Sequence, residues 1–109
     1  MRFEFNGGGG MQLVLRYFDG CPHWRVAVDL LRQALGQTGT TTEVILEAVG
    51  TPGDAERLEF WGSPSLLVDG RDPFADQAGP VGLSCRISRT EQGPRGAPSV
   101  AQLVPALAQ

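Results

Sequence analysis

Residues 17–24, with the sequence YFDGCPHW, decide the fold of this 109-residue chain. They end a mostly apolar run, residues 11–18, which favours a β-strand and which an Asp-Gly step stops. Pro22 suits the first turn of a helix, because its missing N–H costs nothing there. The segment therefore places one cysteine, Cys21, in a turn between a strand and a helix that begins at Pro22 or His23.

The rest of the chain continues to alternate between strands and helices. Apolar side chains at helical spacing follow the turn, among them Trp24, Val28 and Leu31, with charged residues on the other face. The remaining expected elements are a strand at 42–49, a short helix at 51–62, strands at 65–68 and 82–89, and a helix from residue 99.

This order, β-α-β-α-β-β-α, predicts an α/β fold. The first two strands are joined by a helix and should be parallel, whereas the last two are joined by a short loop and should be antiparallel. We therefore expect a mixed four-stranded sheet with helices on both faces.

The domain covers residues 11–109. Residues 1–10, MRFEFNGGGG, are expected to form a flexible extension, because ordering four consecutive glycines is entropically costly.

Composition narrows the possible partners. The chain is 41% hydrophobic and 19% charged, an ordinary balance for one globular domain. A formal net charge of −3 argues against nucleic acid, which requires clustered positive charge. The sequence contains neither a membrane-spanning apolar segment nor a recognisable secretory signal, so we expect a cytoplasmic protein with no membrane partner. Two cysteines in that compartment are expected to be free or catalytic.

A second landmark lies at residues 62–70, GSPSLLVDG, where Ser63-Pro64 directly precedes the third expected strand. A cysteine after the first strand and such a proline further on resemble the minimal thioredoxin fold over roughly residues 11–108. Cys-Pro-His also resembles the C-P-H-C site of the periplasmic disulfide oxidases. The resemblance implies a redox thiol at Cys21 and a cis Ser63–Pro64 bond beside it, with Ser63 and Pro64 facing the substrate.

The chain departs from that family at Trp24, which occupies the position of the resolving cysteine. Without a second cysteine in the motif, the site cannot release its substrate by local attack on the mixed disulfide. It could instead act as a monothiol site with an external thiol, such as glutathione or mycothiol, as co-substrate. No other cofactor and no metal are expected.

Three side chains of the segment have both a functional and a structural interpretation. Cys21 at a helix N-terminus would be partly exposed and favour the thiolate, or it is a capped cysteine without a role. His23 would add positive charge beside the sulfur, or it is an exposed polar residue. Trp24 packs as the first apolar residue of the helix, or it forms a substrate platform.

Cys85 is the only other thiol in the sequence. It alternates with Leu83 and Ile87 along the fourth expected strand, which predicts a buried core cysteine on their face. The alternative is a second, resolving thiol, which requires this strand to return to the end of the sheet that carries Cys21.

The leading functional hypothesis is a thioredoxin-like protein that uses Cys21 for thiol–disulfide exchange or for reduction of a small oxidant. Its partners would be a small-molecule thiol or a protein disulfide. Two cysteines and an aspartate are also the ingredients of alkylmercury lyase, which gives a second hypothesis of a mercury or soft-metal thiol protein. A third is a non-catalytic interaction domain that retains only the fold.

Overall fold

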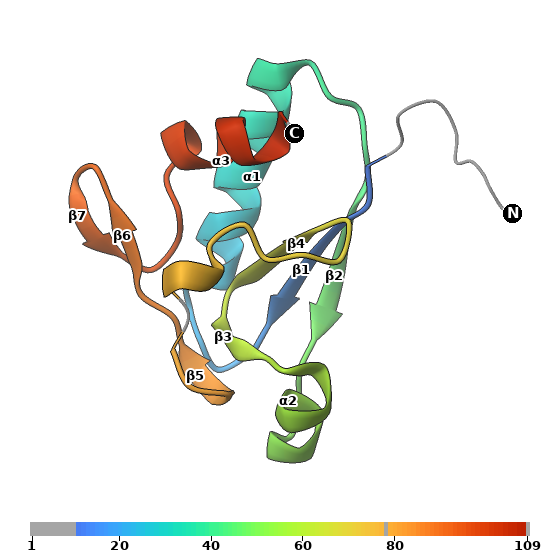
Figure 1. Ribbon diagram of the computed structural model, residues 1–109, viewed down its shortest axis with the longest axis vertical. Helices are drawn as coiled ribbons and strands as arrows, with labels where there is room; N and C mark the ends of the chain where they lie inside the picture. The colour runs from blue at the N-terminus through green and yellow to red at the C-terminus, as the bar shows by residue number, and fades with distance from the viewer. Residues whose placement is uncertain (1–10, 78, 109) are drawn as a thin grey trace, which may run out of the picture.

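The computed structural model describes residues 11–77 and 79–108, so the extension expected at residues 1–10 lies outside the described residues. The fold is mixed α/β, as expected. Along the chain its elements are β1 (Leu13–Tyr17), α1 (Trp24–Thr38), β2 (Val44–Ala48), α2 (Pro52–Leu58), β3 (Trp61–Ser63), β4 (Ser65–Val68), the 3-10 helix η1 (Ala75–Gln77), β5 (Gly82–Cys85), β6 (Ser88–Thr90), β7 (Gly93–Arg95) and α3 (Val100–Leu107) (Figure 1).

The central sheet has three strands in the order β2-β1-β4. Strands β1 and β2 are parallel, as the sequence predicts for two strands joined by a helix, and Leu13 pairs with Val44. Strand β4 runs antiparallel to β1, with Leu15 opposite Leu66. Leu13 and Leu15 therefore share one face of the sheet with Leu66, and that face is buried.

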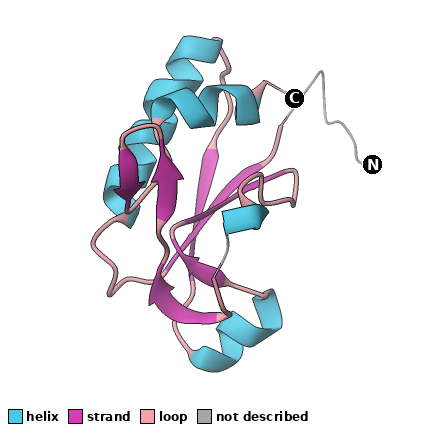
Figure 2. Cartoon of the chain, turned by 60° about the vertical axis from the view of Figure 1, so that its left-hand side comes forward, coloured by secondary structure: helices cyan, strands magenta, loops and turns pink. Residues whose placement is uncertain are grey.

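Helices α1 and α3 cover this buried face together. They lie side by side at one end of the molecule, whereas α2 lies at the other end (Figure 2). The core between them and the sheet consists of small and branched apolar side chains: Leu13, Leu15, Ala27, Val28, Leu31, Ala34, Leu35, Leu66, Ala97, Leu103 and Leu107. Burial of this continuous apolar cluster is the main stabilising contribution to the fold.

Helix α2 closes the opposite end of the sheet. It begins as the sequence predicts, since the Thr51 hydroxyl accepts a hydrogen bond from the Asp54 amide at 3.0 Å. It ends at Leu58 rather than Gly62, because Glu59 adopts a left-handed conformation with φ of 53°. The Leu58 carbonyl accepts a hydrogen bond from Arg16, which projects from the sheet face opposite α1. The second face is thus covered at this end.

The expected four-stranded sheet is wrong, because residues 82–89 do not form one strand beside β4. Strand β5 instead pairs in parallel with β3, with Cys85 opposite Ser63. Strand β6 leaves this pair and forms an antiparallel hairpin with β7. The expected alternation also fails: Arg86 is buried at 6% exposure, whereas Ile87 is 57% exposed.

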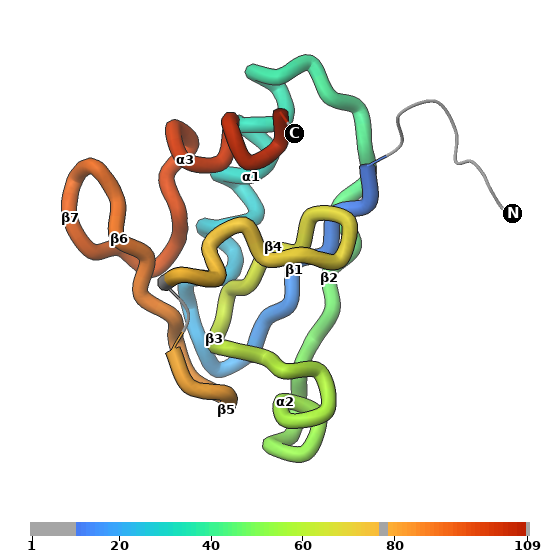
Figure 3. The backbone as a smooth tube through the Cα atoms, viewed as in Figure 1, coloured from blue at the N-terminus to red at the C-terminus, as the bar shows by residue number. Residues whose placement is uncertain are grey.

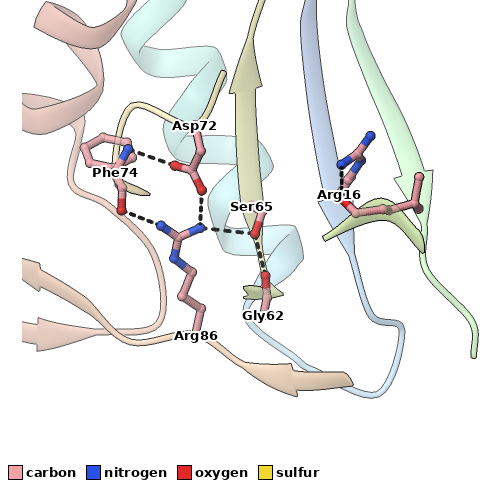
Figure 4. Close-up of polar contacts among 7 residues, drawn as sticks. Arg16, Gly62, Ser65, Asp72, Phe74 and Arg86 are labelled. Atoms are coloured by element: carbon pink, nitrogen blue, oxygen red, sulfur yellow. Dashed lines mark hydrogen bonds and ion pairs between the residues drawn. The ribbon is translucent and has the colours of Figure 1, made fainter. Parts of the chain in front are cut away.

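Arg86 is buried with partners at both terminal nitrogens of its guanidinium group (Figure 4). Its NH1 contacts the Asp72 carboxylate at 2.6 Å and the Ser65 hydroxyl at 3.1 Å. Its NH2 donates to the Phe74 carbonyl at 2.6 Å. Asp72 also accepts a hydrogen bond from the Phe74 amide, so the charge on both sides is compensated. This cluster, which we call the Arg86 network, joins the loop after β4 to the end of β5.

Gly62 allows the chain to approach the Arg86 network closely. It has a φ of +103°, and a Cβ atom on it would lie 3.1 Å from Cβ of Arg86. Its carbonyl accepts a hydrogen bond from the Ser65 hydroxyl at 2.6 Å. The backbone of β3 therefore lies directly against the residue that follows Cys85.

Replacing Arg86 with methionine is expected to lower the free energy of unfolding by about 3–5 kcal/mol, because the Asp72 carboxylate stays buried without its partner. Urea unfolding followed by circular dichroism measures the loss. Arg57→Met is the matched control, since Arg57 pairs with Asp54 at 3.0 Å with 67% of the arginine side chain exposed. Its unfolding midpoint should stay near that of the wild type. An equal loss in both variants would contradict a stabilising role for the buried pair.

Candidate functional site

Cys21 lies in the turn between β1 and α1, where the sequence places it. Helix α1 begins at Trp24 with His23 as its N-cap, one or two residues later than expected. The Cys21 amide donates a hydrogen bond to the Phe18 carbonyl at 2.9 Å, which closes the turn. Two residues therefore separate the cysteine from the first residue of the helix.

The expected partial exposure of Cys21 is wrong. The residue is fully buried, with 0% of its surface accessible. Its sulfur donates a hydrogen bond to the carbonyl oxygen of Ser63 at 3.5 Å. The segment that leads into β4 therefore lies directly on the sulfur, which the sequence alone did not indicate.

The Ser63–Pro64 bond is cis and lies at the Cys21 sulfur, as predicted. Both residues are buried, so neither presents its side chain to solvent as the substrate-facing assignment supposed. The Ser63 carbonyl also accepts a hydrogen bond from the Arg86 amide at 2.8 Å. Within the described part of the chain, the buried Ser63 hydroxyl has no hydrogen-bond partner. Ser63 thus connects the Cys21 turn to the end of β5.

Cys85 lies beside Cys21 and not in the hydrophobic core, so the expected core position beside Leu83 and Ile87 is wrong. It is exposed, and it pairs with Ser63 across the β3–β5 ladder. The turn before α1 and the segment of β5 run next to each other although they are far apart in sequence (Figure 3). The physical reason is the Arg86 network, which turns Arg86 inward and holds the preceding residue against Ser63.

The two thiols interact directly. A hydrogen bond with the Cys21 side chain, together with partial desolvation and the charge of Cys21, raises the pKa of Cys85 to about 11. Thiols in such contact titrate as a pair, because the charge of one sulfur disfavours a second charge beside it. In the reduced protein Cys85 therefore keeps its proton well above neutral pH.

His23 is oriented toward the hairpin that follows β5. A Cβ atom on Gly96 would lie 2.3 Å from Cγ of His23, so the imidazole ring rests on the glycine that follows β7. His23 makes no side-chain cap to α1. It forms one wall of a groove of about 510 Å³ between α1, the β6–β7 hairpin and the start of α3, where Glu91 and Arg95 also contribute.

Trp24 begins α1 and is half-buried. Its ring stacks on Tyr17 with centroids 4.2 Å apart and an interplanar angle of 24°, and the Arg25 guanidinium lies 4.7 Å above it. The indole also packs against the main hydrophobic core. The position that a second cysteine would occupy in a C-x-x-C motif is thus filled by aromatic packing.

The site brings two cysteine side chains together at Ser63. Among residues 11–77 and 79–108, no group of three histidine, cysteine or acidic side chains is placed to hold a metal ion. No helix in the same part of the chain is long and apolar enough to cross a membrane. Comparisons with family models, curated proteins and solved structures find no match for this chain. The chemistry of the site therefore has to be argued from the thiol pair itself.

Removing Cys21 is expected to lower the pKa of Cys85 from about 11 toward the ordinary thiol value near ~8.5–9. The pKa falls because the hydrogen bond and the charge of Cys21 favour the protonated form of Cys85, and both are lost in the variant. Cys21→Ala should increase the rate of Cys85 alkylation by iodoacetamide at pH 8 about tenfold. The thiolate fraction rises about a hundredfold, while the intrinsic nucleophilicity of the sulfur falls about tenfold.

The measurement follows alkylation across pH, with the modified peptide identified by mass spectrometry. As the control, the measurement is repeated on both proteins in concentrated urea. There Cys85 is separated from residue 21, so its thiol should titrate near its ordinary value in both. An identical pH midpoint for Cys85 in folded wild type and in Cys21→Ala would mean that the two thiols do not interact.

Proposed function

We propose that this protein is a thioredoxin-like thiol–disulfide oxidoreductase whose two exchanging thiols, Cys21 and Cys85, come from separate segments of the chain. The single observation that carries the proposal is that both cysteines meet Ser63, whose carbonyl accepts a hydrogen bond from the Cys21 sulfur and which pairs with Cys85 across the β3–β5 ladder. Two thiols held beside one residue can close to a disulfide without a large movement of the backbone. The geometry thus favours a dithiol site over the monothiol site expected from the motif.

The arrangement of the fold supports the thioredoxin-like assignment. The parallel pair β1 and β2, the antiparallel β4 and a helix directly after Cys21 follow the order that the resemblance implies. The cis proline before β4 lies next to that cysteine. The β3–β5 pair and the β6–β7 hairpin replace the antiparallel fourth strand of the expected sheet.

The proposed reaction is a two-electron exchange. When the protein reduces a disulfide R–S–S–R′, Cys21 and Cys85 form a disulfide with each other, and the two substrate sulfurs leave as thiols. Two protons move from the protein thiols to the two leaving groups, so atoms and charge balance. Two molecules of a small thiol such as glutathione or mycothiol return the protein to its dithiol form, and they leave joined as one disulfide.

The same pair of sulfurs favours a second candidate function, the binding of a soft cation. Two thiolates are ligands that copper(I) and mercury(II) prefer, and both ions accept linear two-coordination. An alkylmercury lyase additionally needs an acid to protonate the departing carbon. The described residues gather no acidic group with the two thiols as a third member. The exchange function therefore has the stronger support.

Mild oxidation of the folded protein is expected to give one intramolecular disulfide between Cys21 and Cys85. Peptide mapping without reduction identifies the bond, and titration of free thiols shows the loss of both. The double variant S84C/C85S is the matched control, because it moves the second thiol one position along the strand, where side chains point to the other side. It should keep its thiols free or form bonds between molecules.

Persistence of two free thiols in the oxidised wild type would contradict the dithiol function. If Cys85→Ser then still catalysed exchange in the presence of glutathione, the monothiol mechanism through Cys21 would replace it. Absence of exchange in the wild type itself would favour the non-catalytic interaction domain.

A further inference from the structure

We infer that Cys85, and not the cysteine of the Cys-Pro-His motif, is the thiol that forms the covalent bond to substrate, and that Cys21 is the buried resolving thiol. This inference rests on the proposed exchange function and assigns the two roles within it. The observation behind it is the difference in access: Cys21 is 0% exposed, and Cys85 is exposed at the end of β5.

Access decides which sulfur of a disulfide can be attacked. A thiolate approaches the target sulfur along the S–S axis, from the side opposite the leaving sulfur, so that side must be open. The Cys21 sulfur lies against the Ser63 carbonyl and the Cys85 side chain, in a residue with no accessible surface. Only the Cys85 sulfur offers an outer side to an incoming group.

The surroundings of Cys85 keep it in this position. The Arg86 amide donates to the Ser63 carbonyl at 2.8 Å, immediately after Cys85 in the chain. The Arg86 side chain is fixed in turn by Asp72, so the end of β5 cannot turn over without breaking a buried ion pair. Cys85 is therefore held with one side against Cys21 and the other toward solvent.

Oxidation of two substrate thiols, RSH and R′SH, by the protein disulfide takes place in two steps. The thiolate RS⁻ attacks the Cys85 sulfur, the Cys21–Cys85 bond breaks, and Cys21 leaves as a thiolate. The second substrate thiol then attacks the sulfur of R in the mixed disulfide. R–S–S–R′ departs, and the proton of R′SH passes to Cys85. The substrate loses two electrons, and the protein disulfide gains them.

The reduced product of these steps is the dithiol, because the Cys21 thiolate takes up the proton that RSH released. Cys21 then donates its hydrogen bond to the Ser63 carbonyl again. In the opposite direction, reduction of a substrate disulfide passes through the same mixed disulfide at Cys85, because both directions share their intermediates.

The test measures how strongly the fold protects each thiol from the aromatic disulfide dithiobis(nitrobenzoate). Cys21→Ser leaves only Cys85, and Cys85→Ser leaves only Cys21; each variant is compared in buffer and in concentrated urea. Folding should slow the reaction of Cys21 in Cys85→Ser about a hundredfold or more, because that sulfur reacts only after a local opening. Folding should slow Cys85 in Cys21→Ser by less than about tenfold, and this variant should keep a stable mixed disulfide.

The wild type separates this inference from the proposed function. Release of two equivalents of thionitrobenzoate, with a Cys21–Cys85 disulfide left behind, supports the exchange function whichever sulfur reacts first. Equal protection of both thiols, or stronger protection of Cys85, would overturn the assignment of roles while leaving that function intact. A stable adduct on the wild type without an internal disulfide would instead overturn the exchange function itself.

Discussion

The buried ion pair between Arg86 and Asp72 is the constraint on which the site depends. A guanidinium group withdrawn from water is tolerated only where a carboxylate and further acceptors meet it, and here that place lies beneath the loop after β4. Once the Arg86 side chain faces inward, its backbone amide can donate to the Ser63 carbonyl. Cys85, which precedes it, is then brought beside Cys21. An ion pair that takes no part in thiol chemistry thus decides which two cysteines lie beside each other.

The features that sequence could predict are local ones. The strand that ends before Cys21, the helix that follows, the parallel pairing of the first two strands and the cis proline all depend on short patterns of residue type. The pairing of β5 with β3 depends instead on a partner for Arg86 that is distant in sequence. Alternation of Leu83, Cys85 and Ile87 suggested a buried face, because the spacing of apolar residues is the main signal for the buried face of a strand.

Two details could not be read from the motif for a related reason. The burial of Cys21 results from the close approach of the Ser63 segment, and the position of His23 results from contact with Gly96. Both depend on how distant segments pack. Arg86, in the middle of residues 82–89, was the available signal of an unusual environment, since a charged residue within a strand needs a partner if it is buried. The acidic residues between 69 and 76 were candidates for that partner.

The separation of the two thiols along the chain couples the proposed disulfide to folding. A disulfide within a C-x-x-C motif closes a ring of four residues and removes about 2 kcal/mol of chain entropy from the unfolded state in the simple loop model. A bond from residue 21 to residue 85 closes a ring of roughly 65 residues and removes about 4 kcal/mol in the same model. The ring would contain α1, β2, α2, β3, β4, η1 and β5. In the proposed oxidised form, more than half of the chain would therefore belong to one covalent ring, and loosening any part of that ring would make the bond easier to reduce.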